Sequence, residues 1–400
     1  MARRRVQVWL LIPVLGIGVL AAFVMGLWAF VAATTTPIYP SDEDVASLEV
    51  ARATTAWDSP IAEARRLVRS GVREQNLPGI SVAVGVGGSV VWAEGFGWAD
   101  LEARVPASPS TRFRIGTMST LLTSVGVGRL LDQGALSLDT PIHTYVPEYP
   151  IQPWPVTVRQ LMAHTAGIRP DEGDEEPVTA PCDTTDEGLA HFADSPLLFE
   201  PGSRFRYSTY GWRLVSAAVE TVSLQPFVRY MRNAVFEPLG LEDIQANAPG
   251  EPMRERAVHY HPRFAADTRY GPQAPTPLDT SCFSGSGAFL STASDLARFV
   301  MAVQGGNVLT PGTLTALQTP VVLPTGDDTG YGLGWDLETV TIGGVERRVV
   351  FEDGMLRGGR VASLLAVRED GVVVVVLANI AFADTSTLAL QVADIFTSAR

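Results

Sequence analysis

The chain has 400 residues, 46% of them hydrophobic, and a formal net charge of -13. This length and composition suffice for a packed core in one large domain or two ordinary ones, and they exclude a chain that is disordered throughout. The charge argues against nucleic acid or an anionic lipid surface as the main partner of the folded part, because the one dense basic run is Arg3, Arg4 and Arg5.

The first predicted element is a transmembrane helix. Residues 6–33 carry one glutamine and no charge, and the run exceeds the roughly 20 residues that cross a bilayer. By the positive-inside rule, the arginines before it predict a cytoplasmic N-terminus and an extracytoplasmic (periplasmic or cell-exterior) location from about Thr34 onward. The alternative is a cleaved signal peptide, with Val31, Ala32 and Ala33 as the cleavage site, although a signal core is usually about 7 to 15 residues long.

The rest of the chain divides into a connecting segment and a folded domain. We predict that residues 1–33 form the cytoplasmic tip and the anchor, 34–57 a polar tether, and 58–400 the domain. The domain is predicted to begin with an amphipathic helix over 59–76, which has proline near its start and apolar residues at helical spacing. Two runs rich in β-branched and aromatic residues then meet at two consecutive glycines (87–88), which predicts a β-hairpin.

The pattern along the domain predicts its fold class. The helix after Thr117 is apolar almost all round and stops at Gly134, so we expect it to be buried and central. From 157 to 296 the signals favour helices joined by loops, whereas 331–380 holds four strand-like runs and 386–399 a closing helix. Strands at both ends with helices between them predict an α+β fold, in which one antiparallel sheet is built from both chain ends and a mostly helical lobe is inserted.

A series of motifs from about Ser59 to the C-terminus resembles the serine beta-lactamase and penicillin-binding protein superfamily. They are FRIG before a buried helix, DTPIHTYVPEYP, VTVRQLMAHTAGI, PGSRFRYSTYGW, SGSGAFLSTASDLARF, YGLGW and GVVVVVLAN, in consistent order. The subgroup they resemble most is the class C-like branch with the mitochondrial serine beta-lactamase-like proteins. The resemblance implies a beta-lactamase/transpeptidase-like fold, and no cofactor or metal is expected.

The resemblance also locates the reactive positions of the family, which works by covalent acyl transfer. There a serine in S-x-x-K attacks a carbonyl, a lysine one helical turn later helps to activate it, and a tyrosine assists proton transfer. In this chain the motif falls on residues 117–120, with Thr117 at the nucleophile and Thr120 at the lysine. The second motif, Tyr-x-Asn, starts at Tyr207 and ends at Thr209, so the phenol is kept and the amide becomes a hydroxyl.

The third family motif is a lysine or histidine followed by x-Gly. It falls on Glu352, Asp353 and Gly354, which reverses the charge. The family's cation attracts a substrate carboxylate and helps the tyrosine to ionise, whereas acids are expected to repel that carboxylate and raise the pKa of the tyrosine. Arg357 and Arg360 follow shortly and are candidates to restore a positive potential.

The leading hypothesis is that the chain has lost acyl transfer but keeps the backbone groups that bind a ligand. By resemblance, the backbone N–H groups of Thr117 and Met355 form the oxyanion hole, and backbone donors do not depend on side-chain identity. We therefore expect a membrane-anchored, exported pseudoenzyme that binds a peptide-like or peptidoglycan-related ligand or a partner protein. One alternative is a divergent amide or ester hydrolase that uses Thr117 with Tyr207. A second is a structural assembly protein, because the subgroup includes a filament-forming member.

The two cysteines, Cys182 and Cys282, lack the C-x-x-C spacing of zinc or redox sites. In an exported chain they have one possible intramolecular pairing, so we expect a disulfide. The resemblance supports the pairing, because it places Cys182 before the Tyr207 motif and Cys282 just before a glycine-rich turn at 284–287. Both segments are expected to border the same cleft.

Other polar groups have simpler structural interpretations. Ser119 would point about 200° away from the nucleophile position on a helix of 3.6 residues per turn. By resemblance, His164 lies in a structural turn after a helix. His259 and His261 would put two imidazoles on one side of a strand, without a third metal ligand. The acidic run at 171–176 lacks the EF-hand spacing and is expected to be a solvated loop.

Overall fold

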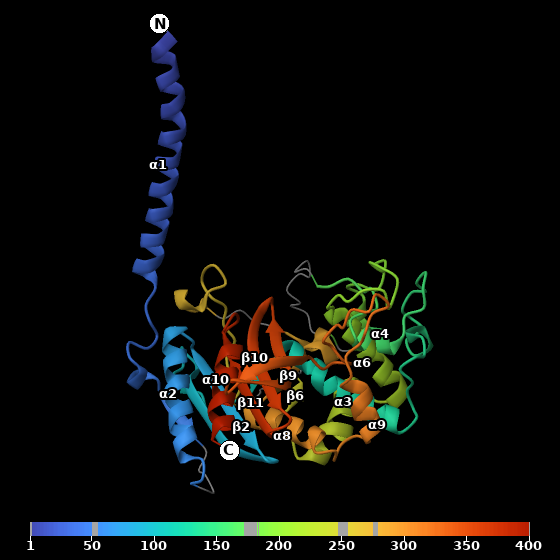
Figure 1. Ribbon diagram of the computed structural model, residues 1–400. Coiled ribbons are helices and arrows are strands. Elements are labelled where there is room, and N and C mark those ends of the chain that lie inside the picture. Colours follow the sequence, from blue (N-terminus) through green and yellow to red (C-terminus); the bar gives the residue numbers. More distant parts are fainter. Residues whose placement is uncertain are drawn as a thin grey trace.

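A computed structural model describes residues 2–49, 55–171, 182, 184–246, 255–274 and 279–399, with the backbone alone described over 2–15. One long helix, α1 (Ala2–Thr34), leads away from a domain of sheet and helices (Figure 1). Within it, residues 16–34 are long and apolar enough to cross a membrane, with a mean hydropathy of 2.2, and none of this stretch is buried. The helix fits either a membrane anchor or a signal sequence.

The main sheet is antiparallel and joins the two ends of the domain. Its strand order is β1-β3-β2-β11-β10-β9-β8, with β4 paired to β3. The strands are β1 (Ser47–Glu49), β2 (Gly79–Val86), β3 (Ser89–Asp100), β4 (Val105–Pro106), β8 (Leu337–Ile342), β9 (Val345–Leu356), β10 (Gly359–Val367) and β11 (Val372–Ala378). The first predicted hairpin is confirmed, since Gly87 and Gly88 join β2 to β3 with φ values of 59° and 86°. The predicted α+β architecture is confirmed too.

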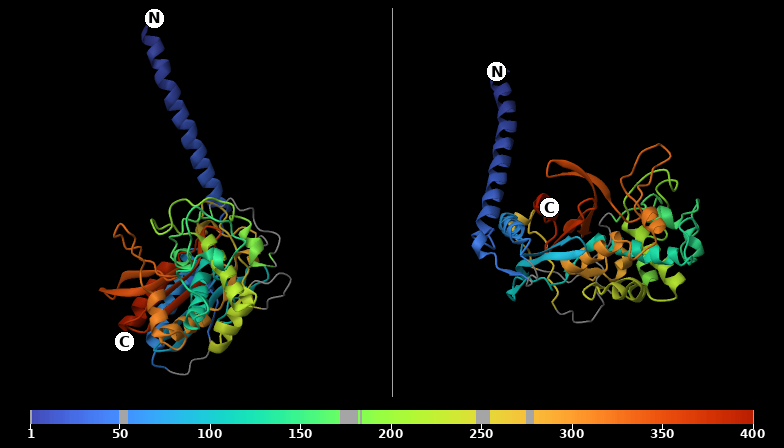
Figure 2. Two further views of the ribbon diagram at one scale, coloured as in Figure 1. Left: turned by 90° about the vertical axis from the view of Figure 1, so that its right-hand side faces the viewer. Right: turned by 60° about the horizontal axis from the view of Figure 1, so that its bottom comes forward.

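Helices cover both faces of this sheet (Figures 1 and 2). On one face lie α2 (Asp58–Glu74) and α10 (Thr385–Ser398), and on the other lie α8 (Ala293–Gln304) and the helical lobe. The residues of β11 alternate between the two cores: Val374 and Val376 join the α2/α10 side, whereas Val373 and Val375 join the lobe side. A continuous valine run therefore forms a central strand buried on both faces.

The helical lobe is built around α3 (Ser119–Asp132), as predicted. Every residue of α3 from Ser119 to Gly128 is buried, and the chain leaves the helix at Gly134 with φ of 67°. The other helices of the lobe are α4 (Val158–Met162), α5 (Thr185–Leu189), α6 (Thr209–Ser223), α7 (Phe227–Met231) and α9 (Pro311–Leu317). A small sheet of order β5-β7-β6 lies beside α3, with β5 (Phe113–Arg114), β6 (Gln245–Ala246) and β7 (Phe289–Ser291).

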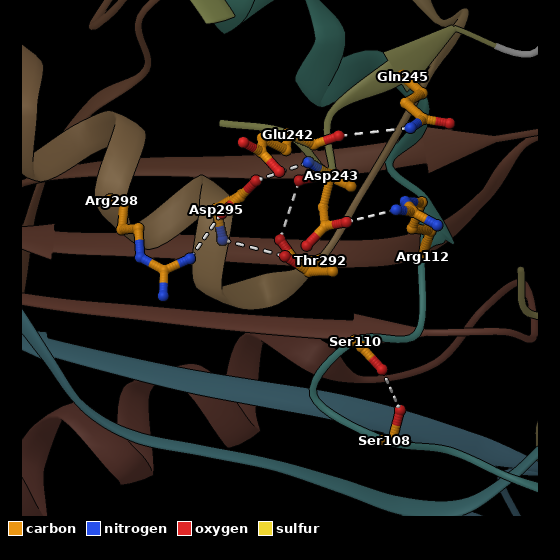
Figure 3. Close-up of polar contacts among 10 residues, drawn as sticks. Ser108, Ser110, Arg112, Glu242, Asp243, Gln245, Thr292, Asp295 and Arg298 are labelled. Atoms are coloured by element: carbon orange, nitrogen blue, oxygen red, sulfur yellow. Dashed lines mark hydrogen bonds and ion pairs between the residues drawn. The ribbon is translucent and has the colours of Figure 1, made fainter. Parts of the chain in front are cut away.

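A polar network fixes the strand that leads into α3 (Figure 3). Arg112, just before β5, forms an ion pair with Asp243. The backbone N–H of Asp243 donates to the Asp295 carboxylate at 2.9 Å, and Arg298 pairs with the same carboxylate at 2.7 Å. Thr292 caps α8 by accepting from the Asp295 N–H at 3.1 Å. The network thereby ties β5 to the start of α8.

The segment after α1 packs against the domain. Arg263 donates to the carbonyl oxygen of Thr34 at 2.8 Å, which links the end of α1 to a loop of the domain. Tyr39 is 3% exposed, and its hydroxyl donates to the Pro78 carbonyl at 2.5 Å. A few residues later β1 pairs with β3. Part of the stretch that we predicted as a tether therefore lies on the domain surface.

Candidate functional site

Thr117 lies in a tight turn, η2 (Gly116–Met118), between β5 and α3. Gly116 has φ of 55°, and a Cβ at this position would collide with the carbonyl group of Met355 on β9. Gly354 is packed in the same way against the backbone of Ile115. Two glycines thus let β9 approach the start of α3 closely, which brings the third predicted motif beside the first.

The hydroxyl of Thr117 forms two hydrogen bonds with the backbone of β9. It accepts a hydrogen bond from the Met355 N–H at 2.9 Å and donates one to the Asp353 carbonyl at 3.2 Å. A hydroxyl has one proton to donate, so this proton faces a carbonyl oxygen rather than a base. The N–H predicted as an oxyanion donor is therefore occupied by the side chain of Thr117 itself.

Thr120 lies one helical turn after Thr117 and is fully buried. Its hydroxyl donates to the Thr117 carbonyl at 2.9 Å, which satisfies it locally. No lysine can replace the missing ammonium from elsewhere, because the sequence contains none and all 30 of its Lys+Arg residues are arginine. Ser119 likewise bonds to the backbone, donating to Gly116 O at 2.8 Å, as expected for a structural residue.

Tyr207 packs in an aromatic cluster with His164 and Tyr331. His164 stacks on it with ring centroids 4.0 Å apart, and Tyr331 lies 4.9 Å from His164. The Nδ1 atom of His164 accepts from the Ser208 N–H at 3.0 Å. Burial lowers the pKa of His164 to about 3, so the ring is neutral and structural. The sequence analysis missed Tyr331, although it belongs to the quoted YGLGW motif.

Tyr207 is a phenol rather than a base at neutral pH. Burial raises its pKa, the Glu352 carboxylate raises it further, and a hydrogen bond with Thr117 opposes the shift. The side chain is nevertheless 37% exposed, because it lines a cavity, so solvent moderates the shift. The direction agrees with the expectation from the charge reversal in the third motif.

Glu352 does not occupy the position that we expected. It is 3% exposed and is not among the described residues that line the cavity, so it cannot meet a substrate carboxylate there. Burial raises its pKa well above the ordinary value, and Asp336 raises it further. Asp353, the next acid, pairs with Arg360 at 2.6 Å. The alternation of β9 explains the correction, because Glu352 shares the inward face with Val350 and Gly354.

This burial predicts a pH-dependent effect of Glu352→Gln. The folded pKa lies above the unfolded one, so the folded state is not penalised at acidic pH and loses stability as the pH rises through the folded pKa. We expect the variant to gain free energy of unfolding at pH 9, on the order of 1 kcal/mol or more, and nothing at pH 4. Urea denaturation at both pH values measures this.

The variant and the wild type are compared at the same pH, because two buried histidines make the stability of both proteins depend on pH. His164 and His259 have folded pKa values of about 3 against 6.5 in the unfolded chain. The unfolded state therefore binds more protons between these values, so both proteins lose stability as the pH falls through this range. The matched control is Glu346→Gln, an exposed acid on the same strand, and an equal gain there would contradict the prediction.

A cavity of about 250 Å³ opens over these residues. Its lining includes Thr117, Tyr207, Thr209 and Met355, so it unites four of the positions predicted from the sequence. The charged residues among the described lining are Asp171 on the lobe side and Arg357 in the turn between β9 and β10. Of the two candidate arginines, Arg357 therefore lines the cavity, whereas Arg360 is paired with Asp353.

The predicted disulfide is present between Cys182 and Cys282, whose Cα atoms are 4.9 Å apart. Cys282 belongs to a short helical segment, η7 (Ser281–Ser286), that also carries Phe283 and Ser286 of the cavity lining. The bridge therefore holds a wall of the cavity, as the predicted layout implied.

The remaining polar candidates lie outside this arrangement. The rings of His259 and His261 are 5.4 Å apart, but the segment is not a strand and makes a single bridge between Tyr260 and Ile380. Within the part of the chain that the structure describes, no group of three or more metal-ligating side chains occurs. Most of the acidic run at 171–176 lies outside the described residues.

Comparison with known proteins places this fold in one class, the serine beta-lactamase and penicillin-binding protein superfamily. The beta-lactamase family model matches residues 64–395, and the chain belongs to this family. The serine beta-lactamase-like protein LACTB, mitochondrial, of Homo sapiens is 28% identical over 379 residues, covering 73% of this chain and 67% of that protein. The chain spans only 60% of the bovine protein.

Solved structures show the same fold. An octameric penicillin-binding protein homologue from Pyrococcus abyssi superposes with a TM-score of 0.73 at 25% identity, covering 84% of this chain and 77% of that one. EstCE1, described as a hydrolase with promiscuous acyltransferase activity, gives a TM-score of 0.69 at 22% identity, covering 86% of this chain and 100% of that one.

Proposed function

We propose that this protein is a membrane-anchored, exported member of the beta-lactamase family that binds a peptide-like or peptidoglycan-related ligand without acyl transfer. The observation that carries the proposal is the hydroxyl of Thr117, which is bonded to the Met355 N–H and the Asp353 carbonyl. Its side-chain neighbour is Tyr207, a phenol whose raised pKa makes it a poor base. The absence of lysine from the sequence supports it.

The cavity suits a small part of such a ligand. Its volume of about 250 Å³ is slightly below the usual range of ligand pockets, which begins at roughly 300 Å³. Asp171 and Arg357 give its lining one acid and one base, and charges of both signs suit a ligand that is itself charged, such as a short peptide. A protein partner would have to insert a side chain or terminus there.

Binding without turnover is the test of this function. A D-alanyl-D-alanine peptide is titrated into the purified protein by calorimetry, and the recovered peptide is checked by mass spectrometry. We expect saturable binding and intact peptide. Cleaved peptide would reject the proposal, and so would the lack of binding by both this peptide and muramyl peptides.

Two tryptophan substitutions on β9 locate the binding. Met355→Trp narrows the cavity, because Met355 is 38% exposed and lines it, so we expect at least a tenfold loss of affinity. Val345→Trp is the matched control, since Val345 is 54% exposed at the far end of the strand. Equal losses in both variants would place the ligand elsewhere.

A hydrolase that uses Thr117 is the second candidate. It is favoured by the position of Thr117 in the cavity lining beside the Met355 N–H, where a bound carbonyl would meet a nucleophile and a donor. The structural neighbour EstCE1 is itself described as a hydrolase. This function requires the Thr117 hydroxyl to release both the Asp353 carbonyl and the Met355 N–H and to find a base.

A further inference from the structure

Glu352 is a buried acid that has no cationic partner among the described residues. One carboxylate oxygen of Glu352, Oε2, has no hydrogen-bond partner among the described residues, although the side chain is 3% exposed. A buried carboxylate left unpaired is costly, so such groups normally hold a partner. The charged groups facing it are Asp336 and Asp353, both acids, while Arg360 on β10 is paired with Asp353.

Two tyrosines border the same acid. Phe351, next to Glu352, donates its backbone N–H to the Asp336 carbonyl at 3.1 Å, and Asp336 forms a β-bridge with Tyr331, so the segments of Glu352 and Tyr331 are neighbours. The Glu352 carboxylate raises the pKa values of both Tyr207 and Tyr331. Tyr331 is 4% exposed, and the Thr120 hydroxyl, which already donates to the Thr117 carbonyl, is a weakly aligned neighbour of its hydroxyl. The two rings lie 6.4 Å apart at 85°, and His164 packs against both. Aromatic rings around an acid are a favourable environment for an ammonium group.

We propose that Glu352, Tyr207 and Tyr331 form a binding site for the primary ammonium group of a ligand that enters past Tyr207. Tyr207 belongs both to the cavity lining and to this cluster, so it joins the cavity to the acid. An ammonium group has three N–H donors, so it can donate to the unpaired oxygen of Glu352 and to the lone pairs of the tyrosine hydroxyls. The chain has no lysine to supply this group itself.

Binding at this site is coupled to release of a proton. In the empty site Glu352 holds its proton, because burial and Asp336 raise its pKa. A bound ammonium favours the carboxylate, so the cation displaces that proton. Below the pKa of Glu352, the affinity for the cation rises about tenfold for each pH unit.

Thermal unfolding of the full chain with methylammonium chloride tests the site. At 100 mM or more we expect methylammonium to raise the Tm by about 2 °C or more over sodium chloride of equal ionic strength, and more at pH 8 than at pH 6. Tetramethylammonium, which has no N–H donors, is expected to have no such effect. Equal shifts with all three salts, or none, would overturn the proposal.

Three variants locate the effect. Glu352→Gln is expected to lose the methylammonium shift, whereas Glu346→Gln, on the exposed end of β9, keeps it. Thr120→Lys would place an ammonium near Tyr331 within the chain, so the shift is expected to vanish. Its lysine, the only one in the chain, should resist reductive methylation until unfolding. A retained shift in Glu352→Gln overturns the proposal whether or not the lysine variant folds.

The ammonium site names a chemical group of the ligand and rests on the proposed binding function. The experiments can reject the ammonium site and the binding function independently of each other. Methylammonium is measured without any peptide. A lost methylammonium effect with peptide binding intact would reject the ammonium site alone. The reverse result would keep the ammonium site and reject the peptide class.

Discussion

The purified protein is expected to form no covalent adduct with a penicillin or with a fluorophosphonate. Three requirements of acyl transfer are missing. The nucleophile position holds the hindered alcohol of Thr117, Thr120 offers no ammonium, and Glu352 replaces a cation with a buried acid whose pKa is raised. The Thr117 hydroxyl donates its hydrogen bond to the Asp353 carbonyl, which is too weak a base to take the proton during the reaction.

The expected loss is large. Removing the nucleophile or the base of a hydrolytic triad costs on the order of a million-fold in turnover, and such losses do not add, so one such change is sufficient. Intact-protein mass spectrometry after incubation with each reagent gives the answer directly. An adduct that maps to Thr117 would overturn the pseudoenzyme proposal, and an adduct elsewhere would show that the site is misplaced.

Restoring the family residues is the complementary experiment. The variant that combines Thr117→Ser, Thr120→Lys and Glu352→His is expected to gain the adduct that the wild type lacks. The scaffold supports this, because Gly116 and Gly354 still allow β9 to lie against the start of α3. The matched control is Thr117→Ser alone, which supplies a primary alcohol without an activating group. Acylation of this control would show that the lysine position is not the cause of inactivity.

Removing the disulfide is expected to cause the largest loss of stability. Cys182 and Cys282 close a loop with a sequence separation of 100, and the loop-entropy model assigns about 4 to 5 kcal/mol to a closure of this length. We expect the double variant Cys182→Ala, Cys282→Ala to lose about that much free energy of unfolding in urea. Peptide binding should weaken as well, since η7 carries Phe283 and Ser286 of the cavity lining.

Treatment with a reductant distinguishes the effect of losing the disulfide bond from the effect of replacing the cysteine side chains. The wild type should lose stability in reductant, and the double variant should be insensitive to it. The control is Ser281→Ala, which leaves the bridge in place and removes both hydrogen bonds of the Ser281 hydroxyl, one from the Cys182 N–H at 2.9 Å and one to the Asp279 carboxylate at 2.5 Å. If the double variant loses no more than this control, the bridge contributes little to stability.

The sequence predicted the elements of the fold because their patterns are local. Apolar periodicity identified α3 and α10, and Gly87 and Gly88 identified the first hairpin. That the two ends of the domain share one sheet was predicted from strands at both ends of the chain, which bury their apolar faces by packing together. The structure shows that the strands which join the two ends are β2 and β11, close to 300 residues apart.

The environment of the site was harder to predict. The burial of Glu352 was missed because acids are almost always exposed, although the alternation of Val350, Glu352 and Gly354 already placed it on the inward face. Tyr331 was missed for a different reason, since its contact with His164 joins two distant parts of the chain and no local pattern indicates it. The packing of Tyr39 depends likewise on a carbonyl of the folded domain.

The contacts after α1 also determine how far the domain can move. A flexible coil of the length of residues 35–49 would let a domain wander roughly 20 Å from its attachment. Here Arg263 binds the Thr34 carbonyl, Tyr39 is buried, and β1 belongs to the main sheet. These contacts restrict the movement of the domain relative to α1. Where α1 lies in a bilayer, the cavity stays at a constant height above it, and its search for a ligand becomes a two-dimensional one, governed by lateral diffusion of the helix.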